Sequence, residues 1–329
     1  MARAIRKELR DLGLPATGDL DQITRILRLA KIQQLEHQLP GTTINPGPNV
    51  YEQPPSTGKG DLEPPINQPL TFGNVLGSGG EGITFNCRLA TRDVACKVVP
   101  IIDGNTSLNL EYAWLQRLYQ RGIRVPRPIT KYSTNDIDIM VMEKLDHTLK
   151  AIFESNDNRF NNDEVKGIMI RMLMILERLH DNGDVFVDIK PENIMTDATN
   201  QWLYLIDPGL LYLRGQPAYG KHIGTPKYTS IDAHLGLPLG PSHDLQSLGY
   251  MAASFIRGNL PWDDLTHCNL KTRTPTFEQI LECITHIKQQ TTAAELAPGY
   301  PELKEYLDYV LALKSTDTPD YAYLKSLFS

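Results

Sequence analysis

A glycine-rich turn between two apolar segments constrains the fold of this chain more than any other stretch. Gly77, Gly79 and Gly82 form a complete G-x-G-x-x-G pattern, which occurs in dinucleotide-binding folds and also in ordinary hairpins. A dinucleotide-binding unit would begin a helix at the third glycine. Here residues 83–99, ITFNCRLATRDVACKVV, continue instead as β-branched and apolar residues through a second strand. The pattern therefore predicts a strand–turn–strand unit, in which glycines let backbone amides approach a phosphate group.

A lysine and a glutamate downstream of this turn are expected to form an ion pair. Lys97 lies in the second strand, and a helix is expected over 105–119 because leucine and tyrosine side chains recur there at helical spacing. Glu111 lies within this helix and is the only acidic residue between Asp103 and Asp136. We therefore expect Glu111 to orient Lys97; the alternative is a lysine exposed on the strand surface.

A polar motif inside an apolar stretch provides the candidate catalytic residues. The segment 185–195, VFVDIKPENIM, places Asp188, Lys190 and Asn193 at the spacing Asp, plus two, plus five. The apolar strand WLYLI follows and leads into Asp207, which begins an Asp-Pro-Gly. Taken alone, the first motif is equally compatible with a surface turn before a capped helix, and Asp-Pro-Gly is a common turn. Their order behind a glycine turn and a strand lysine indicates one catalytic arrangement.

These features together resemble the protein kinases, in which a glycine-rich loop, a strand lysine, a catalytic loop and a metal-binding Asp occur in this order. Residues 224–265 are more specifically similar to the casein kinase 1 superfamily, which includes the vaccinia-related kinases. Ser-Ile-Asp at 230–232 stands where most kinases have Ala-Pro-Glu, and His-Asp-Leu at 243–245 begins the characteristic helix of that superfamily. The resemblance implies an α+β, two-lobed fold, with a small β-rich N-lobe at 71–143 and a large helical C-lobe at 146–329.

The same resemblance implies ATP- and Mg²⁺-dependent transfer of a γ-phosphoryl group to Ser or Thr hydroxyls of proteins, with Mn²⁺ able to replace Mg²⁺. Asp188 would accept the hydroxyl proton, and Lys190 would offset charge on the γ-phosphoryl. Asn193 and Asp207 would hold the metal. The nucleotide would contact Leu76, Gly77, Ser78, Gly79, Gly80, Glu81, Gly82, Thr84, Ala95, Lys97, Glu111, Met142, Glu143 and Leu145, while Thr225, Lys227 and Asp244 would support the substrate or the catalytic loop.

Several residues depart from the kinase pattern. The usual His-Arg before the catalytic Asp is Phe186-Val187, so the arginine that pairs with a phosphorylated activation loop is absent. Pro208 replaces the usual aromatic residue after Asp207, and Glu81 replaces the aromatic residue at the tip of the glycine loop. We therefore predict an activity that needs no activation-loop phosphorylation. A pseudokinase scaffold is the alternative, because such departures accumulate in inactive relatives.

Residues 1–38 form a separate basic segment. They contain seven Lys or Arg and five Asp or Glu, so the segment carries +2 in a chain of net charge −6. The apolar spacing predicts one short helix ending at Gly13 and a second helix starting at 18–21. The pair resembles the SAP module, which generally binds DNA, and such binding would make the chain a DNA-targeted kinase or a DNA-associated adaptor. The alternative is a helical extension that docks on the main domain or mediates self-association. DNA binding would use Arg3, Arg6, Lys7, Arg10, Arg25 and Arg28.

Residues 39–70 are rich in Pro, Gly, Thr and Asn and predict a semi-extended linker, which would let 1–38 act at a distance from the kinase domain at 71–329. The four cysteines are scattered without a C-x-x-C pair, so neither a disulfide framework nor a zinc site is expected. No secretory leader and no apolar span of roughly 20 residues is found. We expect a monomer in the cytoplasm or nucleus without a membrane partner, and the compact kinase domain with its fused basic segment suggests a large DNA virus as the source.

Overall fold

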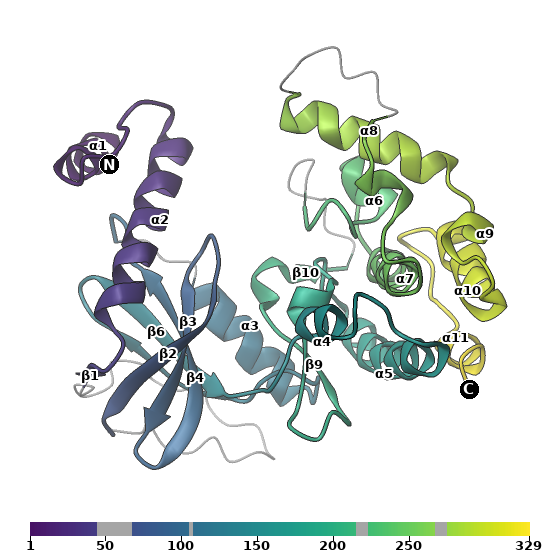
Figure 1. Cartoon of the computed structure of the whole chain (residues 1–329), viewed down its shortest axis with the longest axis horizontal. Helices are drawn as coiled ribbons and strands as arrows, with labels where there is room; N and C mark the ends of the chain where they lie inside the picture. The colour runs from purple at the N-terminus through teal and green to yellow at the C-terminus, as the bar shows by residue number, and fades with distance from the viewer. Residues whose placement is uncertain (45–67, 105–107, 215–222, 267–274) are drawn as a thin grey trace. The chain divides into compact units, whose positions relative to one another are not determined.

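A computed structural model describes the chain outside four short gaps (Figure 1). The chain divides into two compact units. The first is formed by Met1–Gln120 with Pro126–Leu145, and the second by Arg121–Val125 with Asp146–Ser329. The first unit carries a β-sheet and the second is mostly helical, which confirms the predicted α+β class. The described residues are 1–44, 68–104, 108–214, 223–266 and 275–329.

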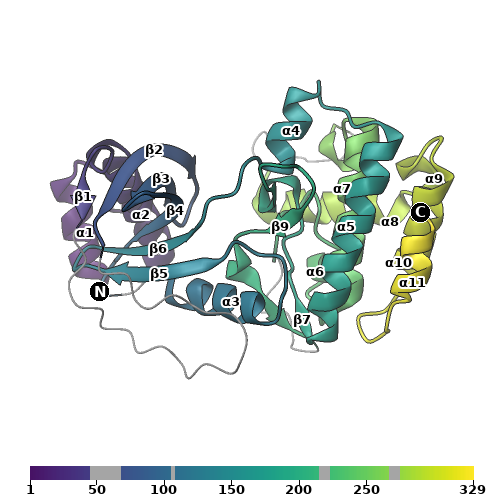
Figure 2. The ribbon, with the colours of Figure 1, turned by 90° about the horizontal axis from the view of Figure 1, so that it is seen from below.

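The sheet of the first unit has six antiparallel strands in the order β1-β2-β3-β4-β6-β5 (Figure 2). The glycine turn joins β2 to β3, so the strand–turn–strand predicted there is present. β1 and the first residue of β2 fall inside 39–70, where a linker was predicted, and pair with each other; residues 45–67 of that predicted linker lie outside the described residues. The strands are β1 (Thr43–Ile44), β2 (Leu70–Ser78), β3 (Ile83–Leu89), β4 (Arg92–Pro100), β5 (Pro128–Ser133) and β6 (Ile137–Glu143).

Each face of this sheet is covered by a different helix. Val94, Cys96 and Val98 on β4 lie in an apolar cluster with Phe72 and Phe85. Ile32 and Leu35 of α2 (Leu20–Gln38) and the following Leu39 pack against the same cluster. The alternate residues of β4 point the other way, toward α3 (Leu108–Gln120). Strands covered on both faces are expected to be apolar on both faces, which explains the continuous run VACKVV in β4.

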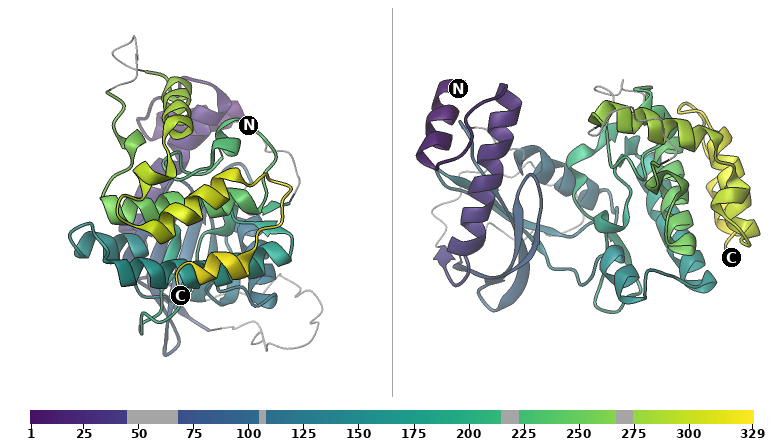
Figure 3. Two further views of the ribbon diagram at one scale, coloured as in Figure 1. Left: turned by 90° about the vertical axis from the view of Figure 1, so that its right-hand side faces the viewer. Right: turned by 45° about the horizontal axis from the view of Figure 1, so that its top comes forward.

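The two N-terminal helices are docked on the first unit. α1 (Ala2–Asp11) and α2 share a core of Ile5, Leu9, Ile23 and Leu27, and Ile102 after β4 completes it. Asp19 caps α2 by accepting from the Gln22 backbone N–H at 2.8 Å. Figure 3 shows α2 lying along the strands. This packing corresponds to the docked helical extension rather than to a segment that acts at a distance.

The second unit is built around two long helices, α5 (Asn162–Asp181) and α7 (Pro241–Arg257), which pack on each other. The start of α5 has a capping box, in which the Asn161 side chain and the Glu164 side chain each accept from the other residue's backbone N–H. Residues 241–255 of α7 are all buried, as expected for a helix at the centre of a helical unit. The other helices are α4 (Leu149–Ser155), α6 (Ile231–His234), α8 (Phe277–Gln290), α9 (Ala293–Leu296), α10 (Pro301–Ala312) and α11 (Tyr321–Ser326).

Short hairpins and single turns complete the second unit. β8 (Ile194–Thr196) pairs with β9 (Leu203–Leu205), and β7 (Asp184–Val185) pairs with β10 (Tyr212–Leu213). Single 3-10 turns lie at Pro191–Asn193, Pro208–Leu210 and Pro261–Asp263. These short elements carry the candidate site, because they hold the polar loops close to α7.

Cys87 and Cys96 are free, buried thiols in the sheet. Cys283 is disulfide-bonded, although no disulfide was expected from the sequence. Among the helices in the described part of the chain, none is both long and apolar enough to span a bilayer.

Candidate functional site

The predicted ion pair between Lys97 and Glu111 is present in the first unit. Lys97 Nζ donates to Glu111 Oε1 at 2.7 Å and to Oε2 at 2.8 Å. The side chains of Lys97 and Glu111 are 12% and 6% exposed. Little water reaches the two charges, so each charge is neutralised by the other. β4 and α3 therefore fix an ammonium group on one face of the sheet.

The glycine turn is shaped by close backbone contacts. Gly79 N–H donates to the Gly82 carbonyl at 2.9 Å. A Cβ at Gly82 would lie 2.5 Å from the Val98 carbonyl oxygen and 2.8 Å from the Val99 side chain, so no side chain fits there without a shift of the strand. The third glycine of the motif is thus required by packing.

The predicted nucleotide residues fall on one face and one edge of this sheet. Thr84 pairs with Lys97, and Ala95 pairs with Met142; because Ala95 and Lys97 are two residues apart, all four side chains share a face. The Glu143 carboxylate accepts from the Arg127 backbone N–H at 3.1 Å. The other predicted residues lie at the end of β2 (Leu76, Gly77, Ser78), in the turn (Gly79, Gly80, Glu81, Gly82), on α3 (Glu111) and just after β6 (Leu145).

Glu81 at the tip of the turn has a partner that the sequence did not predict. Arg28 Nη1 of α2 lies 2.5 Å from Glu81 Oε2. Arg28 belongs to the basic set expected to bind DNA, and in this structure it is engaged with the glycine turn instead. The pair is partly exposed, at 22% and 57%, so its contribution to stability is small.

In the second unit, the Asp188 carboxylate is the centre of a hydrogen-bond cluster. Lys190 Nζ donates to Asp188 Oδ2 at 2.6 Å, and Asn193 Nδ2 donates to the same oxygen at 3.0 Å. Thr225 donates to Oδ1 through its backbone N–H at 2.9 Å and its hydroxyl at 2.8 Å. Lys190 Nζ also lies 3.0 Å from Thr225 Oγ1. The three predicted residues Asp188, Lys190 and Thr225 thus form one fixed group.

The β8–β9 hairpin brings Asn193 and Asp207 to neighbouring positions. Asn193 precedes β8, Asp207 follows β9 by two residues, and Ile206 N–H donates to the Asn193 carbonyl at 2.9 Å. Because the Asn193 amide nitrogen donates to Asp188, its Oδ1 is left as a possible ligand. An amide oxygen and a carboxylate are ligands that suit Mg²⁺, so this pair fits the metal. Within the described ranges, three or more His, Cys, Asp or Glu side chains nowhere form a metal-binding group.

Asp207 and Val187 both have left-handed backbone conformations. Their φ angles are 59° and 77°, which are uncommon for residues with a Cβ and costly for a β-branched residue. Strain of this kind persists only where the surroundings hold it. Val187 directly precedes Asp188, so the groups that hold it also position the carboxylate.

Asp244 holds the Val187 backbone from one side. Its Oδ1 accepts from Val187 N–H at 2.8 Å and its Oδ2 from Phe186 N–H at 2.7 Å. His180 Nε2 lies 2.9 Å from the same Oδ2. Burial raises the pKa of Asp244, but the hydrogen bonds that it accepts from His180 and from the Phe186 N–H outweigh this effect and hold the pKa below its usual value. Asp244 is therefore a buried carboxylate with a full set of donors.

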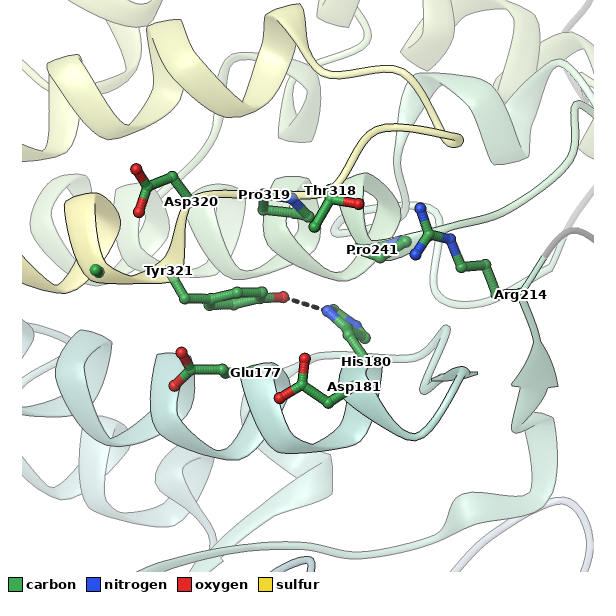
Figure 4. A pocket seen from close by; sticks show the side chains of 10 residues that line it. Glu177, His180, Asp181, Arg214, Pro241, Thr318, Pro319, Asp320 and Tyr321 are labelled. Atoms are coloured by element: carbon green, nitrogen blue, oxygen red, sulfur yellow. Dashed lines mark hydrogen bonds between the residues drawn. The ribbon is translucent and has the colours of Figure 1, made fainter.

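His180 is supported in turn by Tyr321 of α11 (Figure 4). Burial raises the pKa of Tyr321, so its hydroxyl keeps its hydrogen and can donate to His180 Nδ1. This leaves His180 Nε2–H to donate to Asp244. A pocket of about 300 Å³ opens beside these residues, lined also by Glu177, Asp181 and Arg214. It contains none of the predicted site residues.

His243 holds the same backbone from the other side. Its Nε2 lies 2.8 Å from the Val187 carbonyl oxygen, and its Nδ1 lies 2.7 Å from Ser230 Oγ. A carbonyl only accepts, so Nε2 carries the hydrogen and Ser230 donates to Nδ1. Burial lowers the pKa of His243 below 6.5, which favours this neutral form. His243 therefore connects the loop before Asp188 with the start of α6.

Lys227 is engaged at the surface near Thr225. Its Nζ lies 2.7 Å from Asp263 Oδ2. This carboxylate therefore offsets the charge of Lys227, which was expected to support the substrate or the catalytic loop.

Three supporting residues escaped the sequence reasoning: His180, His243 and Lys288. His180 lies on the apolar face of α5 next to Leu179. At such a position the sequence predicts a histidine that is merely packed in the core. His243 lay inside a recognised motif, but its neighbours come from elsewhere in the chain. Lys288 on α8 gave no local signal, because only the fold shows that it is buried.

Comparison with known families agrees with the geometry of both units. The glycine turn, the Lys97–Glu111 pair, the Asp188 cluster and the Asn193–Asp207 hairpin all lie within residues 70–319, which match the family model described as a protein kinase domain. The match covers most of the chain. The chain therefore belongs to the protein kinase family.

Proposed function

We propose that this chain transfers the γ-phosphoryl group of ATP to Ser or Thr hydroxyls of proteins. The observation that carries the proposal is the cluster in which Lys190 and Thr225 both contact the Asp188 carboxylate. A lysine and a threonine paired in this way resemble the Ser/Thr kinases rather than the Tyr kinases. Asp188 is held by four donors, so its position is set before a substrate arrives.

The reaction requires each residue to act on a defined group. Lys97, oriented by Glu111, binds the α and β phosphates. Asp188 orients the attacking hydroxyl and takes its proton, and Lys190 offsets negative charge on the γ-phosphoryl group as it transfers. Asn193 and Asp207 would hold Mg²⁺, which when bound neutralises charge on the phosphate oxygens.

Activation by loop phosphorylation is not expected. The arginine that would read such a phosphate is replaced by Val187, and the Val187 peptide is held instead by two buried side chains, Asp244 and His243. The loop before Asp188 thus has its supports without any phosphate. We propose that the kinase is active as synthesised.

The resemblance of residues 224–265 to the casein kinase 1 superfamily supports placing this kinase there. Members of that superfamily use basic residues to read acidic or phosphorylated sites. Here Lys227 is paired with Asp263, which favours substrates that need no prior phosphorylation.

A transfer assay tests the proposal directly. The full chain is incubated with labelled ATP, Mg²⁺ and casein, beside Asp188→Asn. We expect label on Ser and Thr of casein with the unaltered chain and a loss of at least a hundredfold with the variant. Equal incorporation of label by both proteins would contradict the assignment of Asp188 as the catalytic residue. If neither protein incorporates label, the pseudokinase scaffold would be favoured.

DNA targeting through α1 and α2 is a second candidate function. Arg3, Lys7, Arg10 and Arg25 are exposed on the docked helices, where they can reach phosphates, whereas Arg28 contacts Glu81 and Arg6 donates to the Gly18 carbonyl. Binding of the full chain to duplex DNA should then weaken with salt at a slope of a few units. Absence of binding at low salt would leave the helices a purely structural role.

A further inference from the structure

Lys288 is a buried lysine that the proposed phosphoryl transfer does not use. It lies on α8 and is 3% exposed. Its Nζ donates to the Pro226 carbonyl at 2.8 Å and to the Thr229 carbonyl at 2.5 Å, and it lies 3.2 Å from His234 Nε2. An ammonium group has three N–H donors. These three neighbours therefore account for all of them.

Two aromatic rings complete the surroundings of this lysine. The centroids of Tyr250 and Trp262 lie 4.9 and 5.0 Å from Lys288 Nζ, and the two rings meet edge to face at 5.0 Å. Ring faces attract a cation most strongly where water is excluded. Burial lowers the pKa of Lys288 well below 10.5, with the charge of Asp263 opposing. The two rings and the carbonyl acceptors oppose this effect, because both favour a cation at this point.

The segment that Lys288 contacts, Thr225–Thr229, is the one that reaches Asp188. Thr225 donates twice to Asp188 Oδ1, and its carbonyl accepts from the N–H groups of Tyr228 and Thr229 at 2.9 Å each. Trp262 Nε1 donates to the Lys227 carbonyl at 2.8 Å. One end of the segment is thus bonded to the proposed base, while three of its carbonyls are bonded to Lys288 and Trp262.

We propose that Lys288 is a positioning residue for the protein substrate, because it fixes the Thr225–Thr229 segment beside the carboxylate that receives the substrate hydroxyl. The proposal rests on the proposed Ser/Thr kinase function. Among the described residues, the Lys288 side chain is hydrogen-bonded to this segment and to His234 of α6, the helix that begins just after the segment. Lys288 therefore affects the binding of the protein substrate through the Thr225–Thr229 segment, whereas the glycine turn and Lys97 bind the nucleotide.

The test compares Lys288→Met with a matched control in the full chain. Methionine keeps an unbranched apolar side chain against Tyr250 and Trp262 but has no donors. Lys304→Met makes the same change at an exposed lysine of α10 whose partner is Asp308. For each protein the KM for casein, the KM for ATP and kcat are measured, and amide hydrogen exchange is followed at Tyr228 and Thr229.

We expect Lys288→Met to raise the KM for casein about tenfold, as loss of charged hydrogen bonds implies, with the KM for ATP changed by less than about twofold. Exchange at Tyr228 and Thr229 should speed up by a similar factor, and Lys304→Met should change neither. Lys288→Gln keeps two N–H donors and should give intermediate values. If the methionine variant does not fold, the same measurements are made on Lys288→Gln instead.

Two negative results are distinguishable. If the unaltered chain labels casein no more than Asp188→Asn does, the proposed function fails, and the exchange measurement still tests whether Lys288 holds the segment. If the unaltered chain is active and Lys288→Met or Lys288→Gln leaves the KM for casein and the exchange rates unchanged, the positioning role is wrong. Equal increases of both KM values would also overturn it, because they would indicate general loosening.

Discussion

Replacing Asp244 by asparagine should destabilise the second unit and loosen the loop before Asp188. The carboxylate is 0% exposed and receives Val187 N–H on one oxygen and Phe186 N–H with His180 Nε2 on the other. Asparagine has one acceptor oxygen and one donor nitrogen. In the more favourable orientation of the asparagine amide, its oxygen still accepts from Phe186 N–H and from His180 Nε2–H. The new NH₂ group then faces Val187 N–H, which loses its acceptor.

The cost follows from these contacts. A buried N–H left without an acceptor costs about 1–3 kcal/mol. The two remaining hydrogen bonds lose their charged acceptor, which removes about 1 kcal/mol from each. The free energy of unfolding of the second unit should therefore fall by about 3–5 kcal/mol, and its Tm by about 6–20 °C at roughly 2–4 °C per kcal/mol for a unit of this size.

Circular dichroism during thermal and urea unfolding measures this change, and hydrogen exchange at Phe186 and Val187 localises it. Asp308→Asn is the control, because it removes the same charge from an exposed helix pair with Lys304 worth about 0.3–0.5 kcal/mol. A loss of less than about 1 kcal/mol in Asp244→Asn, or a loss equal to that in the control, would show that Asp244 does not hold the loop through these hydrogen bonds.

The acid dependence gives an independent check. The pKa of Asp244 is held below 3.8 in the folded chain, so its contribution is fully present above that value and is lost as pH falls through the folded pKa. The difference in stability between the unaltered chain and Asp244→Asn should accordingly be constant near neutral pH and shrink below about pH 4. A difference that grows on acidification would contradict the assignment.

Three other changes test separate contacts. Glu111→Gln should lower kcat/KM for ATP about 10- to 100-fold, because it removes the charged partner of buried Lys97; steady-state kinetics showing less than a threefold loss would contradict this. Burial lowers the pKa of His243 below 6.5, so its contribution to stability is present above that pH and lost below it. The Tm should therefore fall more steeply from pH 7.5 to 5.5 than it does in His243→Gln, and parallel curves would count against the neutral form. Arg28→Ala should raise the KM for ATP two- to threefold by freeing Glu81, with the KM for casein unchanged; a shift in both would place the effect elsewhere.

The local parts of the site could be predicted from the sequence. The strand after Gly82 separated this glycine turn from a dinucleotide-binding one, and the absence of other acids near Glu111 identified the partner of Lys97. Asp188 and Asn193 are five residues apart in one loop, so their spacing alone limits where they can lie. In each case the residues that matter are close in sequence or follow a strand or helix period.

The supporting contacts could not be predicted, because they join distant parts of the chain. Lys288 is a polar residue near the end of a helix, and only the arrangement of Tyr250 and Trp262 shows that it is buried between rings. The position of α2 did leave a signal that the sequence reasoning missed. Val94, Cys96 and Val98 form an apolar face opposite the face of Lys97, which indicates that a second layer covers it.

The docked helix α2 also determines where a stable fragment of this protein can begin. The family match begins at residue 70, which invites expression of a fragment from that point. Such a fragment would lack Ile32, Leu35, Leu39 and Ile44 and would leave the sheet face around Phe72 and Phe85 open to water. Full burial of an aliphatic side chain such as Ile32 stabilises by about 1.5–3 kcal/mol, and a bare apolar sheet face promotes aggregation. Insolubility of that fragment beside a soluble full-length chain would therefore reflect a missing layer of the small unit.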